Sequence, residues 1–467
     1  MKVEFLTHAA LRITNEKMNF VCDPWILNEP VYNFSTWKFP KATVDPQEIA
    51  DNCNVLFITH SHEDHFHIPS LNLFRRDVRI ILPEYTSHPS MRAQTIERTL
   101  RKLGFHNIRK VHPWKKIEIS EDVYLTIIPC ASSRGHDWEN AGFVIEDDNT
   151  KILNMNDNVS NVSLCKQVKN WWPKIDIGFI QSVGVTMYPG CFYMSEEKMR
   201  EESAKKKVSL NEQRRLVDII TPKTVVPFAG DFCWLDKKYE HNNWASRGTP
   251  KMFVDFMEEE YADKGVEYLI MNPGDAWTKA DGYINNSEKI DWPNYLDEIE
   301  KLKTEFAQKI ESIRGWINKS SQENMEARTK KRLATIDKHM SKDYIDFSAK
   351  FRYIVTCPEK LTFVFQANPD DGFSYAYGDN DTEVDQTLYI EPEIWAAVLE
   401  GKLTMNIIQW VAKADQHVPY RIDIGRFHFW LEYLVDLNTK NCQVYLDEKI
   451  LEEGCDPVDP NRGVFDD

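Results

Sequence analysis

Residues 57–69, FITHSHEDHFHIP, place four histidines and two acids within eight consecutive positions. Three of the histidines and the aspartate follow an HxHxDH spacing: His60, His62, Asp64 and His65. Imidazole nitrogens and carboxylate oxygens at this density suit one or two divalent metal ions. Histidines on a solvated loop are the alternative, which is weaker because this spacing is improbable among only 13 histidines.

The segment before the motif is what must position these side chains. Residues 55–59 are apolar and β-branched, which predicts a buried strand whose carboxyl end delivers His60. In an extended or loop conformation His60 and His62 project to the same side, while Asp64 and His65 lie on the following turn. Two adjacent ligand sets are therefore expected at one strand end.

Two further residues of this stretch fall outside the pattern. Glu63 occupies its variable position and is expected to face solvent or a neighbour, and His67 is expected on the surface or beside the ligands. With no thiolate in the set, iron, manganese and zinc all remain suitable metals.

Up to about residue 285 the sequence alternates short strand-like runs with helical stretches, which predicts a layered α/β domain, residues 1–285. Strands are expected at 3–13, 19–22, 55–59, 78–82, 123–129, 143–145, 151–155, 176–180 and 224–227. Helices are expected at 91–103 and 210–220.

The later part of the chain has a different character. Apolar residues recur every three or four positions from Leu296 to Ile317, which predicts an amphipathic helix ending near Asn318. A second, polar helix completes an expected helical connector, residues 286–349, for which a coiled-coil homodimer is the alternative. Residues 350–467 combine a predicted hairpin pair with a helical segment, which indicates a separate small α+β domain.

Composition and charge exclude several classes of function. The net charge of −16 disfavours binding to a nucleic-acid backbone. No apolar run of about 18 residues is present, so no membrane span is expected. The first residues lack the signal-peptide pattern, and the nine scattered cysteines contain no CxxC pair, which favours a reducing cytoplasmic location.

The HxHxDH motif resembles that of the metallo-β-lactamase superfamily, which implies a four-layer αββα sandwich with its site at the strand ends. THAALRI around His8 and VCDPW around Asp23 resemble the opening of the lactonase and N-acylphosphatidylethanolamine phospholipase D branches. His136 in SSRGHDWENAGFVIE matches the third histidine ligand, and Asp157 in KILNMNDN matches the bridging aspartate.

The resemblance implies a role for each of these residues. One metal would be held by His60, His62 and His136, and a second would be held in part by Asp64 and His65. Asp157 would bridge the two metals, and Asp64 could also orient a reacting water, so these two carboxylates are the implied catalytic residues.

Four other residues are placed less firmly. His8 and Asp23 are expected beside the ligands, with a core histidine and a turn aspartate as the alternatives. Arg134 and Tyr188 are candidates for substrate contact near the strand ends, with a surface position as the alternative.

One departure from the hydrolytic branches concerns the second metal. Those branches carry a final histidine after the strand that reads TVVPFAGDFCW here, and residues 228–230 offer no ligand at that place. Asp231 or His241 could substitute as a metal ligand or could contact the substrate, although a surface position for His241 is an equal alternative. The second site is thus expected to be incomplete, open or differently filled.

A narrower resemblance follows from ITHSHEDHFHIPSL, KILNMNDN, residues 182–198 and PFAGDF, which together are similar to the catalytic region of the CMP-N-acetylneuraminate hydroxylase family. That family implies an iron-dependent monooxygenation with electrons from a Rieske cluster. The sequence contains no CxH…CxxH pair for such a cluster, so either the reaction differs from the hydroxylation of a sialic acid or a separate ferredoxin-type donor supplies the electrons. EIWAAVLEGKLT is similar to sterol-carrier-like domains appended to alkyl sulfatases, which implies an apolar wall for a substrate or a dimer contact.

These features predict a non-haem iron-dependent oxygenase that acts on a small polar or carrier-linked metabolite. One or two iron ions are expected, with zinc or manganese as alternatives. The second hypothesis is a metal-dependent hydrolase, such as a lactonase, thioesterase or phosphodiesterase, that uses a metal-bridging hydroxide. A non-catalytic binding protein is disfavoured because every ligand of the pattern except the last is present.

Overall fold

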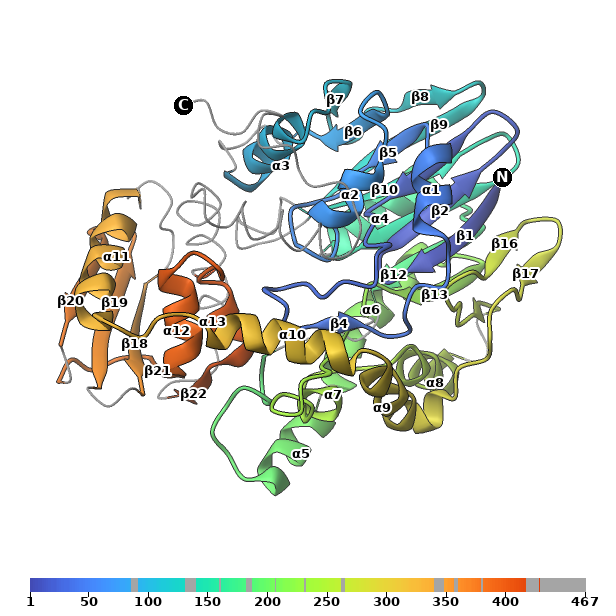
Figure 1. Ribbon diagram of the computed structural model, residues 1–467. Helices are drawn as coiled ribbons and strands as arrows, with labels where there is room; N and C mark the ends of the chain where they lie inside the picture. Colours follow the sequence, from blue (N-terminus) through green and yellow to red (C-terminus); the bar gives the residue numbers. More distant parts are fainter. Residues whose placement is uncertain are drawn as a thin grey trace.

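The computed structural model separates the strands of the chain into two regions joined by helices (Figure 1). The structure describes residues 1–84, 91–130, 140–158, 161–181, 187–205, 207–230, 232–261, 265–339, 348–356, 360–378, 381–416 and 428. Two large sheets are built from residues before 285, and a third sheet begins at residue 349.

The first sheet has eight strands in the order β17-β16-β1-β2-β3-β5-β6-β7. Strands β1 to β3 are antiparallel neighbours, whereas β3, β5, β6 and β7 run parallel. The bounds are β1 Lys2–Thr7, β2 Ala10–Thr14, β3 Asn19–Cys22, β5 Val55–Phe57, β6 Arg79–Pro83, β7 Ile108–Val111, β16 Ala276–Thr278 and β17 Gly282–Ile284. The single run expected at 3–13 is thus a hairpin of two strands.

The second sheet has seven strands in the order β15-β13-β12-β11-β10-β9-β8. Strands β8 to β11 are antiparallel neighbours, and β11, β12, β13 and β15 run parallel. The bounds are β8 Ile117–Ser120, β9 Val123–Pro129, β10 Ala141–Glu146, β11 Lys151–Asn156, β12 Ile177–Gln181, β13 Thr224–Phe228 and β15 Glu267–Tyr268.

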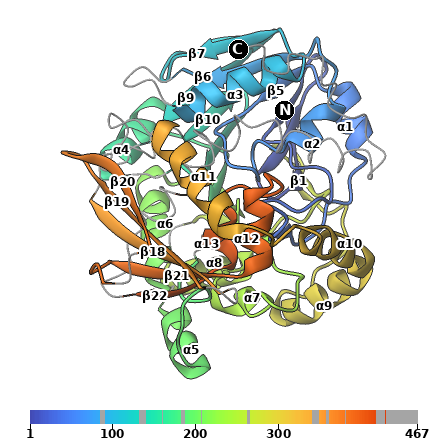
Figure 2. The same cartoon turned by 60° about the vertical axis from the view of Figure 1, so that its left-hand side comes forward.

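Apolar side chains from both sheets meet in one core, in which Phe20 and Phe57 of the first sheet contact Phe143 of the second. Helices cover the two outer faces, with α1 and α2 on one side of the strands and α4 and α6 on the other (Figure 2). The first face is covered by α1 Pro46–Asn52, α2 Ile68–Leu73 and α3 Met91–Lys102. The other face is covered by α4 Val162–Trp171, α6 Lys207–Ile220 and α8 Pro250–Tyr261. The predicted four-layer αββα arrangement is confirmed.

Smaller elements cross the end of this sandwich and lead to the helical connector. They are β4 Trp37–Lys38, which pairs with β14 Phe232–Cys233, and the helices α5 Glu196–Ala204 and α7 Asn242–Ala245. The connector contains η3 Trp292–Asn294, α9 Tyr295–Glu305, α10 Ala307–Asn318 and α11 Met325–His339. The amphipathic pattern after Leu296 is therefore two helices rather than one, because the chain breaks at Phe306, whose ring stacks on Trp37.

The third sheet has the order β20-β19-β18-β21-β22. It shares a core with α11 and with the two helices of its own region (Figure 1). Its elements are β18 Ala349–Val355, β19 Leu361–Asn368, β20 Gly372–Tyr377, β21 Gln386–Ile390, β22 Lys413–Gln416, α12 Pro392–Leu399 and α13 Ile407–Val411. The expected helical segment ends at Val411, because the next residues pair with β21 as a strand. We call residues 349–416 the C-terminal sheet region; its likeness to sterol-carrier domains stays a prediction.

Within the described ranges, none of the helices combines the length and the apolar character that crossing a lipid bilayer requires.

Two glycines provide a paired test of this packing. A Cβ atom on Gly142 would lie 2.7 Å from the carbonyl oxygen of Asn154, whereas one on Gly315 of α10 would meet nothing within 4 Å. We expect Gly142→Ala to lower the free energy of unfolding by about 1–3 kcal/mol through overpacking. Gly315→Ala should raise it by about 0.5–1 kcal/mol, because alanine favours a helix. Urea unfolding of both variants measures the two shifts, and equal shifts would contradict the sheet pairing.

Candidate metal centre

The residues of the centre lie where strands of the two facing sheets end. His8 follows β1, Asp23 follows β3, Asn156 ends β11 and Ala229 follows β13, and their φ angles are 43°, 43°, 49° and 50°. Residues other than glycine rarely adopt this left-handed conformation, and such strain is retained where the surroundings enforce it, often at functional sites. The chain thus turns sharply at the carboxyl end of each of these strands.

The first donor group consists of His60, His62 and Asp157, each of which offers a ligand atom within 4.8 Å of the others. His60 Nε2 is 2.9 Å from His62 Nδ1 and 3.9 Å from Asp157 Oδ2. His60 is buried, whereas His62 and Asp157 are partly accessible. This group therefore combines two imidazoles and one carboxylate at the more open side of the centre.

The second donor group consists of His8, Asp64 and His65, all of which are buried. Asp64 Oδ2 is 2.8 Å from His8 Nε2 and 3.2 Å from His65 Nε2. His65 Nε2 is also 3.4 Å from Asp157 Oδ2. The Asp157 oxygen thus faces a histidine of each donor group.

Asp23 lies beneath the ligands and fixes the direction of His65. Its carboxylate contacts Nδ1 of His65 at 3.0 Å and accepts hydrogen bonds from the backbone N and Oγ1 of Thr59 and from Nδ2 of Asn156. A carboxylate on one ring nitrogen orients the other nitrogen toward a metal. Here that other nitrogen is Nε2 of His65, which faces both Asp64 and Asp157.

The buried charges of the centre are strongly coupled. Burial alone would raise the pKa of Asp64, but the imidazoles of His65 and His8 outweigh it and hold this pKa well below its ordinary value. Burial would lower the pKa of His65, yet Asp64 and Asp157 hold it well above its ordinary value. A carboxylate that faces such a cationic partner is also well placed to face a metal cation.

The donor atoms fit a divalent metal ion. They are nitrogens and oxygens, they converge within 4.8 Å, and no cysteine belongs to either group. In addition, the buried Nε2 of His65 lies 3.2 Å from Asp64 Oδ2 and 3.4 Å from Asp157 Oδ2, but within the described part of the chain it has no partner with the geometry of a hydrogen bond. A buried polar atom that lacks a hydrogen bond is costly and calls for an explanation, which a bound metal would provide.

The other predicted residues are distributed differently. His241 Nε2 is 2.9 Å from the carbonyl oxygen of Gly190 and 3.2 Å from Nζ of Lys413, so it belongs to neither donor group. Tyr188 packs edge-on against Phe192, and its pKa is raised by burial and by a hydrogen bond with Glu202. His136, Arg134 and Asp231 lie outside the described residues.

Three residues that support the ligands were not expected from the sequence. Tyr32 donates its hydroxyl to Asp64 Oδ1 at 2.5 Å, and burial, followed by the charge of Asp64, raises the pKa of this phenol well above its ordinary value. Gln181 donates from Nε2 to Asp157 Oδ1 at 2.9 Å, and Asn156 donates to Asp23. Gln181 and Asn156 end neighbouring parallel strands, which is a signal the sequence offered, whereas nothing near Tyr32 in sequence marks it.

The two flanking residues of the motif are also engaged. Glu63 accepts hydrogen bonds from the backbone nitrogens of Tyr32 and Asn33, so it faces a neighbour. His67 is buried just before α2, with Nδ1 2.7 Å from Oγ of Ser70, so the surface alternative for His67 is wrong.

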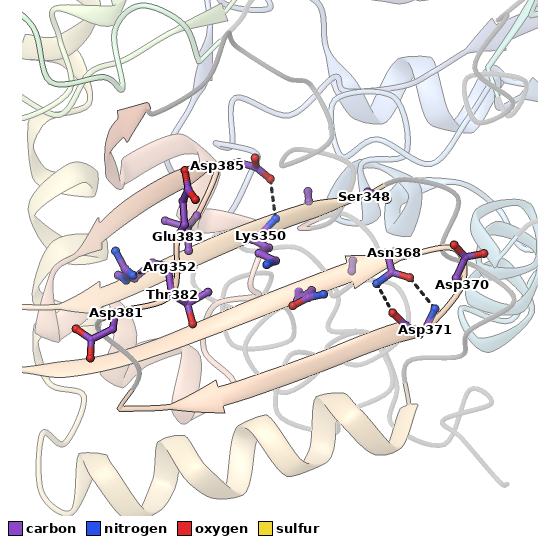
Figure 3. Close-up of a pocket in the computed structure, with 14 residues that line it drawn as sticks. Ser348, Lys350, Arg352, Asn368, Asp370, Asp371, Asp381, Thr382, Glu383 and Asp385 are labelled. Carbon is purple, nitrogen blue, oxygen red and sulfur yellow. Dashed lines mark hydrogen bonds between the residues drawn. The ribbon is translucent and has the colours of Figure 1, made fainter.

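Two hollows of the described structure lie away from the donor groups. One of about 960 Å³ opens on the C-terminal sheet region, where Asp370, Asp371 and Asp381 line it together with Lys350 and Arg352 (Figure 3). Another of about 440 Å³ lies between that region, α10 and residues 33–37. Neither is lined by a residue of the two donor groups.

Comparison with known proteins gives a family and several relatives. Residues 19–228 match the family model described as the beta-lactamase superfamily domain. A protein of Mycolicibacterium smegmatis named as a Rieske 2Fe-2S iron-sulfur protein is 27% identical over 282 residues, which are 59% of this chain and 52% of the relative. The cytidine monophosphate-N-acetylneuraminic acid hydroxylase of Xenopus laevis is 24% identical over 242 residues, which are 50% of this chain and 38% of the relative. The chain thus spans about half of the length of the first relative and less than half of the length of the second.

The solved structures that match part of this chain include a hydrolase and a hydroxylase. An isothiocyanate hydrolase from Delia radicum gut bacteria has a TM-score of 0.43 and 14% identity, and the match covers 60% of this chain and 99% of that chain. CmlA, a diiron β-hydroxylase from Streptomyces venezuelae, has a TM-score of 0.39 and 15% identity over 58% of this chain and 53% of that chain.

Asp23 and Thr59 allow the support of His65 to be tested. In Asp23→Asn the amide NH₂ would oppose groups that now donate to the carboxylate, so we expect metal affinity to fall about 10–100-fold. Thr59→Ser keeps the hydroxyl that contacts Asp23 and serves as the matched control, with affinity near that of the original chain. Competition with a metal chelator measures both, and an unchanged affinity in Asp23→Asn would contradict the role of Asp23.

Proposed function

Because residues 19–228 match the beta-lactamase superfamily domain, we propose that this chain is a dinuclear metalloenzyme of the hydroxylating, iron-dependent type. Its substrate would be a small polar or carrier-linked metabolite. The observation that carries the proposal is Asp157 Oδ2, which lies 3.9 Å from His60 Nε2 and 3.4 Å from His65 Nε2. One carboxylate that faces both donor groups is the arrangement a metal pair requires.

The choice of iron over zinc rests on sequence similarity, because imidazole and carboxylate donors without a thiolate suit iron, manganese and zinc alike. The relatives that share the matched region include a hydroxylase and proteins named for a Rieske cluster, and this similarity supports hydroxylation with electrons from a ferredoxin-type partner. When bound, iron ions would supply the redox chemistry that activates dioxygen, whereas zinc ions would supply an acidified water.

The residues of the chain would hold and orient this centre. His60 and His62, with His136 as a third histidine, would bind one metal, and Asp64 and His65 would bind the other. Gln181 donates to Oδ1 of Asp157, which leaves Oδ2 directed at both donor groups.

His8 would complete the second site in place of the ligand that residues 228–230 lack. Its Nε2 is 2.8 Å from Asp64 Oδ2, and its ring packs against Phe232 with the centroids 4.7 Å apart. The backbone N of Ala229 donates to the carbonyl oxygen of His8, which ties the two strand ends together. His8 therefore lies at the end of β1, next to the end of β13. The hydrolytic branches carry their final histidine at the end of the strand that corresponds to β13.

Two single substitutions test whether His8 or His241 is a ligand of the second metal. We expect His8→Ala to retain one equivalent of metal per chain where the original chain retains two, because its ring belongs to the second donor group. His241→Ala should retain both, because His241 contacts Gly190 and Lys413 instead. Metal analysis after gel filtration gives the stoichiometry. Loss of a metal in His241→Ala alone would contradict the assignment.

Hydrolysis is the second candidate function, and the ionised carboxylate of Asp64 favours it. His65 and His8 outweigh the opposing effect of burial and hold the pKa of Asp64 well below its ordinary value, so the carboxylate stays ionised and could orient a water by accepting a hydrogen bond from it. A lactone, thioester or phosphodiester substrate would then be cleaved without oxygen.

Oxygen dependence separates the two functions. The full chain is purified without air and loaded with Fe²⁺ or Zn²⁺. Oxygen uptake with a reduced ferredoxin is then measured over a panel of small polar and carrier-linked metabolites. Hydrolysis of a lactone, a thioester and a phosphodiester is measured in parallel under argon. We expect substrate-dependent oxygen uptake only with Fe²⁺.

The control variants for this experiment are two histidine substitutions. His60→Ala should lower the rate at least about 100-fold because it removes a ligand, and the exposed His112→Ala should leave the rate unchanged. Turnover of an ester by the zinc form under argon, with no oxygen uptake by the iron form, would contradict the oxygenase proposal.

A further inference from the structure

A strained turn lies between the metal centre and the C-terminal sheet region. Tyr32, Asn33 and Phe34 have φ angles of 52°, 57° and 67°, so three consecutive residues with side chains adopt the left-handed conformation. L-amino acids normally visit this conformation as single residues. A turn of this kind persists only where contacts on its outside hold it in place.

On one side, two residues of the HxHxDH motif hold the turn. They are Glu63, at a variable position of the motif, and Asp64, its aspartate. Glu63 Oε2 accepts hydrogen bonds from the backbone nitrogens of Tyr32, at 2.5 Å, and of Asn33, at 3.4 Å. The hydroxyl of Tyr32 donates to Asp64 Oδ1 at 2.5 Å. The motif therefore contacts the turn through both of its acids.

On the other side the turn is held by the C-terminal sheet region. Asn33 and Thr404 form a reciprocal pair, in which Asn33 Nδ2 donates to Thr404 Oγ1 at 2.8 Å and Thr404 N donates to Asn33 Oδ1 at 2.6 Å. The ring of Trp410 stacks on Tyr32 with centroids 4.4 Å apart and planes inclined by 28°. Tyr32, Asn33, Thr404 and Trp410 are all buried.

We propose that Tyr32 is a positioning residue through which the C-terminal sheet region fixes the orientation of Asp64 in the metal centre. The inference rests on the proposed dinuclear site, since it concerns how one ligand of that site is held. Because Tyr32 occupies Oδ1 of Asp64, the Oδ2 atom is the one left facing His8 and His65. Retention of the second metal therefore depends on contacts made more than 300 residues away in sequence.

The physical reason is that each contact limits the freedom of the next. The Asn33–Thr404 pair fixes the turn, and stacking on Trp410 limits rotation of the Tyr32 ring. A fixed ring holds its hydroxyl on one carboxylate oxygen, and a buried hydroxyl that lost this partner would be left unsatisfied. Loosening any of these contacts lets the Asp64 carboxylate rotate, and a supporting contact of this kind changes metal affinity about 10–100-fold when removed.

The test uses Co²⁺ alone as the probe, titrated into the full metal-free chain and followed by visible absorption. Tyr32→Phe removes the hydroxyl and keeps the ring. We expect it to weaken binding of the second Co²⁺ about 10–100-fold and to leave the first unchanged. Its matched control is Tyr353→Phe, which removes a buried hydroxyl of the C-terminal sheet region that contacts His428 and lies away from the turn.

Thr404→Val carries the inference itself, because Thr404 forms hydrogen bonds with Asn33 of the turn and belongs to neither donor group. We expect it to weaken the second Co²⁺ about 3–10-fold, less than Tyr32→Phe because one further contact separates it from Asp64. Thr362→Val is the matched control, since Thr362 is a buried threonine of β19. Trp410→Phe should retain more of the affinity than Trp410→Ala, because a smaller ring can still stack.

The outcomes are distinguishable. If the original chain binds two Co²⁺ and both Tyr32→Phe and Thr404→Val bind them equally well, the inference is overturned while the proposed function stands. The same holds if Thr404→Val and Thr362→Val both lower only the unfolding temperature and leave Co²⁺ binding unchanged. If the original chain binds fewer than two Co²⁺, the proposed dinuclear function fails, and the inference fails with it.

Discussion

The metal centre depends on carboxylates and imidazoles that lie together, almost inaccessible to solvent, where strands of two sheets end. Asp23, Asp64 and His65 are each at most 1% exposed, and an isolated charge there would be prohibitively costly. Asp64 and His65 remain charged because they face one another, which lowers the pKa of Asp64 and raises that of His65. A metal ion satisfies the same constraint by supplying positive charge to the carboxylates. The centre is thus organised for cations before any is bound.

The sandwich meets this constraint through the direction of its strands. Strands β1, β3 and β5 of one sheet and β11 and β13 of the other deliver their carboxyl ends to one place. Left-handed residues such as His8 and Asp23 then turn the chain so that side chains point into it. The turn at residues 32–34 adds a contact from the C-terminal sheet region, so the third sheet supports the centre although it contributes no ligand to either donor group.

The sequence predicted the parts of this arrangement that are local. The HxHxDH motif is read directly from spacing, and β3 and β9 were expected with their observed bounds because their apolar runs are short and well delimited. The break at Phe306 was missed because the apolar period continues through it, and the strand β22 was missed because its pairing with β21 depends on residues far away in sequence.

The supporting residues show the same limit. His8 was placed beside the ligands, and only the folded chain brings its Nε2 to Asp64. Tyr32 could not be identified at all, because its role depends on Glu63 and Trp410, which meet it only in three dimensions. Spacing within one segment therefore reveals ligands, but it does not reveal the contacts that orient them.

The most direct test of the account is anomalous X-ray diffraction from crystals of the full chain loaded with Fe²⁺ without air. The account predicts two peaks at the iron edge, about 3.5–4 Å apart, with the Asp157 carboxylate between them and His8 beside one of them. No peak at this place, or a single peak with the His8, Asp64 and His65 side chains turned away from it, would contradict the account.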